Sequence, residues 1–132
     1  MRSPADILRE AKTIALVGAS PKPDRPSHGV MRYLLGQGYD VIPVRPEGCD
    51  EVLGVSCVRS LAEIDRPIDL VDVFRRAEFT PEVAQAAVDV GAKALWLQLG
   101  IISDEARGIA EAAGLDYVEN ACTAVVHRSE VV

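Results

Sequence analysis

The fold is decided by the stretch Thr13-Ile14-Ala15-Leu16-Val17-Gly18-Ala19-Ser20. Residues 13–17 form a continuous apolar run, and a run of this length without polar alternation is typical of a buried parallel strand. Gly18 then allows a tight turn and a close approach of backbone to a ligand. A proline-rich loop follows over residues 19–26, and residues 30–34 have the apolar spacing of a helix. The stretch therefore predicts a strand, a turn and a helix in that order.

The same order of strand and helix repeats along the chain. Strands are predicted at residues 41–44, 70–74, 94–97 and 116–118, and helical segments beginning at Ser60, Thr80 and Ser103 separate them. Strands that alternate with helices indicate a parallel sheet covered on both faces, with right-handed crossovers. No linker or internal repeat interrupts this order. We therefore expect residues 1–132 to form a single Rossmann-like, three-layer α/β domain with a mostly parallel five-stranded sheet.

Composition and charge exclude several classes of protein. Hydrophobic residues make up 48% of the chain and charged residues 26%, and no apolar run approaches the roughly 20 residues that cross a bilayer. The first residues lack the pattern of a signal peptide, so we expect a cytoplasmic protein without a membrane partner. The formal net charge of -6 argues against a general nucleic-acid binder, because that role needs a cationic face.

The cysteines and histidines do not form a recognisable metal-binding or catalytic motif. The odd number of cysteines, without a CxxC pair, gives a poor disulfide framework and an equally poor zinc site, and Cys49 and Cys57 are expected to be incidental. His28 and His127 do not form a metal motif or a nucleophile motif. We therefore assign no metal ligand and no catalytic residue. His28 lies at the start of a predicted helix, where it either contacts a phosphate or is simply a helix-end residue.

A ligand site is expected beyond the carboxyl ends of the strands, where open parallel sheets bind their ligands. Arg45 and Arg75 directly follow two of the strands, and Arg25 precedes the first crossover helix. Arginine suits phosphate because its planar group donates two hydrogen bonds at once. The alternative is that each arginine pairs with a neighbouring carboxylate at the surface. Because all three follow strands or precede a helix at one edge, we favour an anion site.

The residues that follow the first and second strands indicate which nucleotide the site could bind. The turn at Gly18 matches neither GxGxxG nor GxxxxGK[ST], although the helix beginning near Pro26 and Ser27 offers free N–H groups to a diphosphate. NAD usually requires an acidic residue at the end of the second strand, where this chain has Arg45. Arginine at that position suggests a phosphorylated ribose, which both NADP and coenzyme A (CoA) carry.

Four segments resemble a known family in sequence and in order. Residues 14–20, 37–44, 71–75 and 95–100 are similar to the small stand-alone CoA-binding proteins, which are related to the N-terminal CoA-binding domain of the succinyl-CoA synthetase α-subunit. The resemblance covers nearly the whole chain, from about Ala11 to Cys122. It implies CoA or an acyl-CoA as the small-molecule ligand.

The resemblance also implies a set of binding residues. Those expected near the phosphates and the nucleotide are Gly18, Ala19, Ser20, Arg25, Ser27, Val44 and Arg45. Those expected at the border of the site and along the pantetheine arm are Phe74, Arg75, Leu97, Gln98, Leu99, Asn120 and Cys122. Asn120 and Cys122 belong to an element similar to the Asn-Cys element of the synthetase domain.

Three functions of the protein are considered. The phosphohistidine of the synthetase belongs to a second domain that this chain lacks, so we favour a non-catalytic CoA-binding carrier, sensor or subunit. One alternative is the NADP-binding domain of an oxidoreductase. The other is an enzyme of thiol or thioester transfer that uses Cys122, which is otherwise a small buried apolar residue. The sequence leaves open free CoA against acyl-CoA, and exposed sheet edges are compatible with a homodimer.

Overall fold

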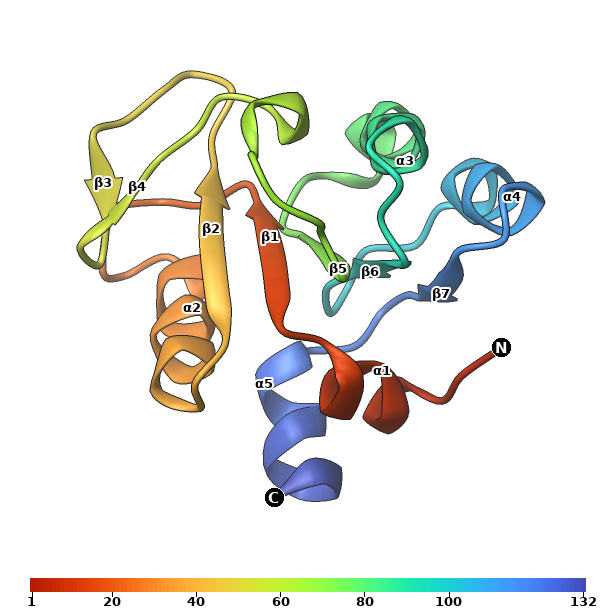
Figure 1. The fold of residues 1–132 in the computed structure, drawn as a ribbon, viewed down its shortest axis with the longest axis horizontal. Coiled ribbons are helices and arrows are strands. Elements are labelled where there is room, and N and C mark those ends of the chain that lie inside the picture. The colour runs from red at the N-terminus through yellow and green to blue at the C-terminus, as the bar shows by residue number, and fades with distance from the viewer.

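Five parallel strands form the central sheet, in the order β2-β1-β5-β6-β7 (Figure 1). The computed structural model describes residues 1–132. The strands are β1 (Thr13–Val17), β2 (Asp40–Val44), β5 (Leu70–Val73), β6 (Ala94–Leu97) and β7 (Asp116–Val118). The chain moves to one side of β1 for β2 and to the other side for β5, so the topological switch point lies at β1 and β5. This order confirms the predicted Rossmann-like parallel sheet.

Helices cover both faces of the sheet, which gives three layers (Figure 1). One face carries α1 (Pro4–Glu10), α2 (Pro26–Gly36) and α5 (Thr123–Val126), and the other carries α3 (Thr80–Asp89) and α4 (Asp104–Ala112). Side chains of β1 alternate between the two layers: Ile14 and Leu16 pack in the core with α1 and α2, whereas Ala15 and Val17 pack in the core with α3 and α4. None of the helices has the length and apolar composition to cross a bilayer.

Local signals set the ends of several helices. Ser3 precedes α1 and accepts a hydrogen bond from the backbone N–H of Asp6 at 3.1 Å. Ser103 precedes α4 and accepts one from Ala106 at the same distance. Both are N-caps that satisfy otherwise unpaired N–H groups. Short 3-10 helices are present at η1 (Leu61–Glu63) and η2 (Ala77–Phe79).

The segment between β2 and η1 contains structure that the sequence analysis treated as loop. A small hairpin pairs β3 (Glu51–Val52) with β4 (Val55–Ser56). Its two central residues, Leu53 and Gly54, have φ values of 51° and 79°, as a type I′ turn requires. Cys49 and Cys57 are joined by a disulfide across the base of this hairpin. The expectation that these two cysteines are incidental is therefore wrong, because the hairpin brings them together.

Two smaller differences concern the ends of elements. Strand β5 ends at Val73, one residue before the predicted end at Phe74. After Cys122 the chain forms α5 and then a π-helical turn, η3 (His127–Val131). His127 is buried there and its Nδ1 lies 2.8 Å from the hydroxyl of Tyr33. Its ring also packs edge-on against Tyr33 and Tyr39, so this residue has a packing role between α2 and the C-terminal helical segment, and burial lowers its pKa.

Candidate functional site

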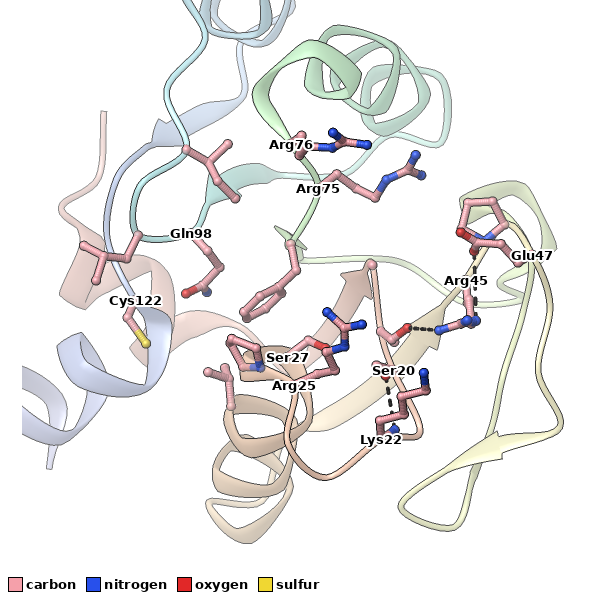
Figure 2. A pocket seen from close by; sticks show the side chains of 18 residues that line it. Ser20, Lys22, Arg25, Ser27, Arg45, Glu47, Arg75, Arg76, Gln98 and Cys122 are labelled. Carbon is pink, nitrogen blue, oxygen red and sulfur yellow. Dashed lines mark hydrogen bonds and ion pairs between the residues drawn. The ribbon is translucent and has the colours of Figure 1, made fainter.

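A pocket of about 610 Å³ lies at the carboxyl ends of β1, β2, β5 and β6, beside the beginning of α2 (Figure 2). This is the edge of the sheet, and includes the switch point, at which ligands of open α/β sheets bind. Figure 2 shows Gln98 and Cys122 toward one end of the pocket and Arg45 and Glu47 toward the other. Arg25 and Arg75 lie between these ends in the same view.

The pocket brings together most of the residues that the sequence analysis selected. Those that line it are Gly18, Ala19, Ser20, Arg25, Ser27, Arg45, Phe74, Arg75, Gln98, Leu99 and Cys122. They come from five separate strand ends or loops, as the parallel topology requires. The remaining selected residues do not line the pocket: Val44 and Leu97 are buried in the core, and Asn120 is exposed.

Each of these three lies in or holds a segment next to the pocket. Val44 is 2% exposed, and its carbonyl accepts hydrogen bonds from the N–H groups of Gly18 and Ala19 at 3.0 and 3.3 Å. Leu97 is the last residue of β6 and is fully buried in the core. Asn120 accepts a hydrogen bond from the N–H of Gly100 at 2.8 Å, which anchors the loop after β6. The contact of these three residues with a ligand stays a prediction.

Other lining residues were missed by the sequence analysis. They are Lys22, Pro26, Val30, Pro46, Glu47, Arg76 and Ile101. Three of the seven, Pro26, Pro46 and Arg76, are direct neighbours in sequence of a selected residue. Loop conformation decides which neighbour faces the pocket, and periodicity carries no information about a loop. Lys22 had one usable signal, because it is a cation in the loop between the first strand and its helix.

Gly18 lines the pocket and lies close to the backbone at the end of β5. Its φ is +90°, and a Cβ built on it would lie 2.4 Å from the carbonyl oxygen of Phe74. The backbone N–H of Phe74 in turn donates to the carbonyl of Val17 at 2.8 Å. Only glycine permits both this φ and this approach between the ends of β1 and β5.

Cations dominate the middle and one end of the pocket. Arg25, Arg75 and Lys22 have no carboxylate within 4.0 Å, and Arg75 instead packs over the ring of Phe79 at 4.7 Å. Arg45 lies 4.0 Å from Glu47 and donates to the carbonyl of Ala19 at 3.3 Å.

The alternative in which each arginine is neutralised by a neighbouring carboxylate therefore does not hold for Arg25 and Arg75. Arg76 does have such a partner, since its Nε lies 3.7 Å from Glu78. Lys22, Arg25 and Arg75 together with Arg45 form an electropositive surface that can bind a polyanion.

The other end of the pocket is more apolar. Leu99 and Ile101 follow Gln98 in the loop after β6 and contribute apolar side chains, and Leu99 is 72% exposed. Phe74 and Val30 are further apolar residues of the lining. Cys122 is a free, half-buried thiol at this end. Its position is fixed by the preceding residue, because the indole N–H of Trp96 donates to the carbonyl of Ala121 at 2.9 Å. This end therefore suits an uncharged, partly apolar chain.

A buried polar network lies directly behind Gln98. Asp72 is fully buried on β5, between Leu16 of β1 and Trp96 of β6 in the sheet register. Its carboxylate accepts hydrogen bonds from Gln98 Nε2 at 2.6 Å and Thr123 Oγ1 at 2.9 Å. Burial raises the pKa of Asp72 to about 7, although both hydrogen bonds lower it. Asp72 was not among the residues predicted from the sequence, where its one signal is a lone carboxylate within an apolar strand.

His28 does not line the pocket. It is 5% exposed within α2, and its Nδ1 is the one enclosed side-chain nitrogen or oxygen without a hydrogen-bond partner. The alternative of a direct phosphate contact therefore has no support in the geometry. No group of three or more His, Cys, Asp and Glu side chains is arranged to hold a metal ion.

Relatives by sequence include two curated proteins with different coverage. The chain is 43% identical to the uncharacterized protein YneT of Bacillus subtilis over 122 residues, which is 92% of this chain and 90% of that protein. It is 29% identical over 93 residues to the alpha subunit of acetate–CoA ligase [ADP-forming] I of Pyrococcus furiosus. That match covers 67% of this chain and 20% of the ligase subunit.

Solved structures give the same picture. A hypothetical protein from Pyrococcus horikoshii superimposes with a TM-score of 0.93 at 42% identity, covering 99% of this chain and 94% of that one. A protein from Thermus thermophilus superimposes with a TM-score of 0.89 at 37% identity, covering 93% and 92%. The sequence profile of the CoA binding domain matches residues 12–128. Together with the pocket at the carboxyl edge of the sheet, this match places the chain in the CoA binding domain family.

Proposed function

We propose that this protein binds CoA or an acyl-CoA in the pocket described above and acts as a non-catalytic carrier, sensor or subunit. The observation that carries the proposal is the polarity of the pocket. Unpaired cations occupy its middle and one end, and apolar side chains with a free thiol occupy the other. CoA has the same polarity, with phosphates on the nucleotide and an uncharged pantetheine arm that ends in a thiol.

The nucleotide of CoA fits the end that contains Arg45. Lys22, Arg25 and Arg75 are free to pair with the diphosphate, and the N-terminal end of α2 adds N–H groups beside Ser27. Arg45 stands at the end of β2, where the ribose of a nucleotide lies in Rossmann-like folds. Its guanidinium suits the 3′-phosphate of CoA.

The pantetheine arm fits the opposite end of the pocket. Phe74, Gln98 and Leu99 line this end, and the thiol of the ligand would lie near Cys122. The apolar, partly exposed Leu99 leaves room for a thioester as well as for a free thiol. Recognition is the chemistry that these groups provide, so we assign a binding role to the pocket rather than ligase chemistry.

Calorimetric titration with CoA tests this function. We expect saturable binding by the wild-type protein and a loss of about tenfold or more in Arg45→Glu, because a repulsive carboxylate replaces a phosphate partner. Arg32→Glu is the matched control, since Arg32 is exposed on α2 and does not line the pocket. It changes the net charge by the same amount and should leave affinity nearly unchanged.

Native mass spectrometry of the purified protein identifies a ligand that is carried through purification. Recovery of CoA, an acyl-CoA or a disulfide-linked CoA supports the proposal and names the form that is bound. An absence of CoA binding at millimolar ligand contradicts it. Quenching of NADPH fluorescence with no CoA binding would instead favour the NADP alternative, because both ligands carry a phosphorylated ribose.

A further inference from the structure

The wall of the pocket contains the side-chain amide of Gln98, which is hydrogen-bonded to buried residues on the side away from the pocket. Gln98 is 4% exposed and lines the pocket at the end of β6. Its Nε2 donates to Asp72 Oδ1 at 2.6 Å and to Thr123 Oγ1 at 2.9 Å. A side-chain amide nitrogen has two hydrogen atoms, so both are used within the protein.

The two partners of Gln98 accept hydrogen bonds from its amide, but neither has a hydrogen atom available to donate to it. The single hydroxyl hydrogen of Thr123 is directed to Asp72 Oδ2 at 2.9 Å. Burial raises the pKa of Asp72 to about 7, and above this pH its carboxylate is ionised and only accepts hydrogen bonds. If the amide of Gln98 were rotated by half a turn, its oxygen would face a carboxylate oxygen and a hydroxyl oxygen that has no hydrogen to offer. The network therefore selects one orientation of the amide.

In this orientation the oxygen of the Gln98 amide has no hydrogen-bond partner within the protein. No protein group donates to Gln98 Oε1, and among enclosed side-chain nitrogen and oxygen atoms only His28 Nδ1 lacks a partner. Oε1 is therefore not enclosed, and it is reached from the pocket that Gln98 lines. A buried, fixed acceptor at the pocket wall favours a ligand group that donates a hydrogen bond.

We propose that Asp72 and Thr123 are positioning residues that fix Gln98 as the acceptor for an amide N–H of the pantetheine arm. This inference rests on the proposed function. Gln98 lies toward the end of the pocket opposite Arg45 (Figure 2), and pantetheine carries two amide N–H donors along its length. Thr123 is fully buried and does not line the pocket, so it acts only through its neighbours.

The test compares two ligands and two substitutions at one position. Thr123→Val keeps the size of the side chain and removes the hydroxyl, whereas Thr123→Ser keeps the hydroxyl. Calorimetry with CoA should show about tenfold weaker binding for Thr123→Val and near wild-type binding for Thr123→Ser. Adenosine 3′,5′-bisphosphate lacks the pantetheine arm, so its affinity should be the same in wild type and both variants.

A second substitution shows whether Thr123 acts through Gln98. Gln98→Met removes the acceptor at similar volume and should weaken CoA by a similar factor. If the effect of Thr123 passes through the amide, Thr123→Val adds no further loss of CoA affinity in the Gln98→Met background. Thermal unfolding of each variant establishes that the protein titrated is folded, and Gln98→Met tests the acceptor without any change at position 123.

The outcomes separate this inference from the proposed function. Failure of the wild-type protein to bind CoA contradicts the proposed function and removes the basis of the inference. Normal CoA binding by wild type with an equal loss of both ligands in Thr123→Val overturns the inference alone, because a merely structural role affects both. Unchanged CoA affinity in folded Gln98→Met overturns it as well.

Discussion

Gly18 holds the ends of β1 and β5 close enough to form the floor of the pocket. An alanine Cβ at this position would meet the carbonyl of Phe74 at 2.4 Å, at a φ of +90°. We expect Gly18→Ala to lower the free energy of unfolding by about 2 kcal/mol or more, since strain at a positive φ adds to the steric clash. Urea denaturation measures this loss.

Gly108→Ala is the matched control for that substitution. Gly108 lies within α4, and a Cβ on it would meet no atom within 4 Å. Alanine there should raise the free energy of unfolding by about 0.5–1 kcal/mol, because it favours the helix and restricts the unfolded chain. Equal effects of the two substitutions would contradict the role assigned to Gly18.

Asp72 should make the stability of the protein depend on pH in the opposite direction from an ordinary paired carboxylate. Burial raises its pKa from 3.8 to about 7. Between these values the unfolded chain has lost the proton and the folded protein retains it. The free energy of unfolding therefore falls as pH rises, by at most about 1.4 kcal/mol per pH unit, and is constant above the upper value.

Asp72→Asn isolates this contribution from those of other carboxylates. The hydrogen-bonded Asp40, Asp69 and Glu119 have lowered pKa values, so their titration lies at lower pH and is shared by both proteins. The difference in unfolding free energy between wild type and Asp72→Asn should change between about pH 4 and about pH 7. A constant difference over that range would show that Asp72 titrates normally.

Single residues also show what the sequence could and could not predict about the site. Arg25, Arg45 and Arg75 line one pocket, because their positions after strands or before a helix fix the edge of the sheet on which they lie; their contact with a ligand stays a prediction. Asp72 and Thr123 were missed because they come from β5 and α5, which are separated by 51 positions in the chain. Their hydrogen bond depends on the packing of α5 on the sheet, which periodicity does not reveal.

The hairpin of β3 and β4 lies in the segment that follows Arg45, at one end of the pocket. The N–H of Arg45 donates to the carbonyl of Val58 at 2.8 Å, just beyond the hairpin. Val52 of β3 is 1% exposed and packs in the core. The disulfide of Cys49 and Cys57 closes the chain between these contacts, so it restricts the segment that follows Arg45.

Removal of this disulfide should weaken both stability and nucleotide binding. We expect Cys49→Ser/Cys57→Ser to lower the free energy of unfolding by about 2–3 kcal/mol, the contribution of a short closed loop. Binding of adenosine 3′,5′-bisphosphate should weaken because Arg45 becomes less well ordered. Thermal unfolding with and without reductant measures the first effect, and calorimetry measures the second. Cys122→Ser should respond to reductant as wild type does, since Cys122 is a free thiol.

Elements differed in how far the sequence revealed them. The strands of the central sheet are four or five residues long, apart from β7, and their apolar runs predicted them almost to the residue. Strands β3 and β4 have two residues each, which is too short for any periodic pattern to identify. Their turn, Leu53-Gly54, carries a leucine at positive φ, where asparagine or glycine would have given a recognisable signal.

At the scale of the whole molecule, charge is divided between the two edges of the sheet. Carboxylates at or next to the N-terminal ends of strands are paired: Asp40 lies 2.7 Å from Arg66, Asp69 lies 3.3 Å from Lys93, and Asp116 lies 2.6 Å from Arg2. Cations at the carboxyl edge are largely unpaired. A protein with a formal net charge of -6 thus presents an electropositive pocket. The carboxylates at the opposite edge pair with other cations, so they do not neutralise the cations of the pocket.

This division of charge predicts how salt affects binding. Exposed ion pairs contribute about 0.2–1 kcal/mol each, and salt screens them over about 10 Å at 0.1 M. With two or three cations facing the phosphates, CoA affinity should fall by roughly fivefold to tenfold between low salt and about 1 M salt. The affinity for pantetheine, which carries no charge, should not fall.

Substitutions at the two edges make this prediction specific to the pocket. Arg25→Gln removes an unpaired cation from the pocket and should reduce the dependence of CoA affinity on salt. Arg66→Gln removes a paired cation from the opposite edge and should leave that dependence unchanged, while lowering stability slightly through the loss of its pair with Asp40. Calorimetric titrations with CoA across a salt series measure both. If the two variants have the same salt dependence, the whole molecule rather than the pocket attracts the ligand.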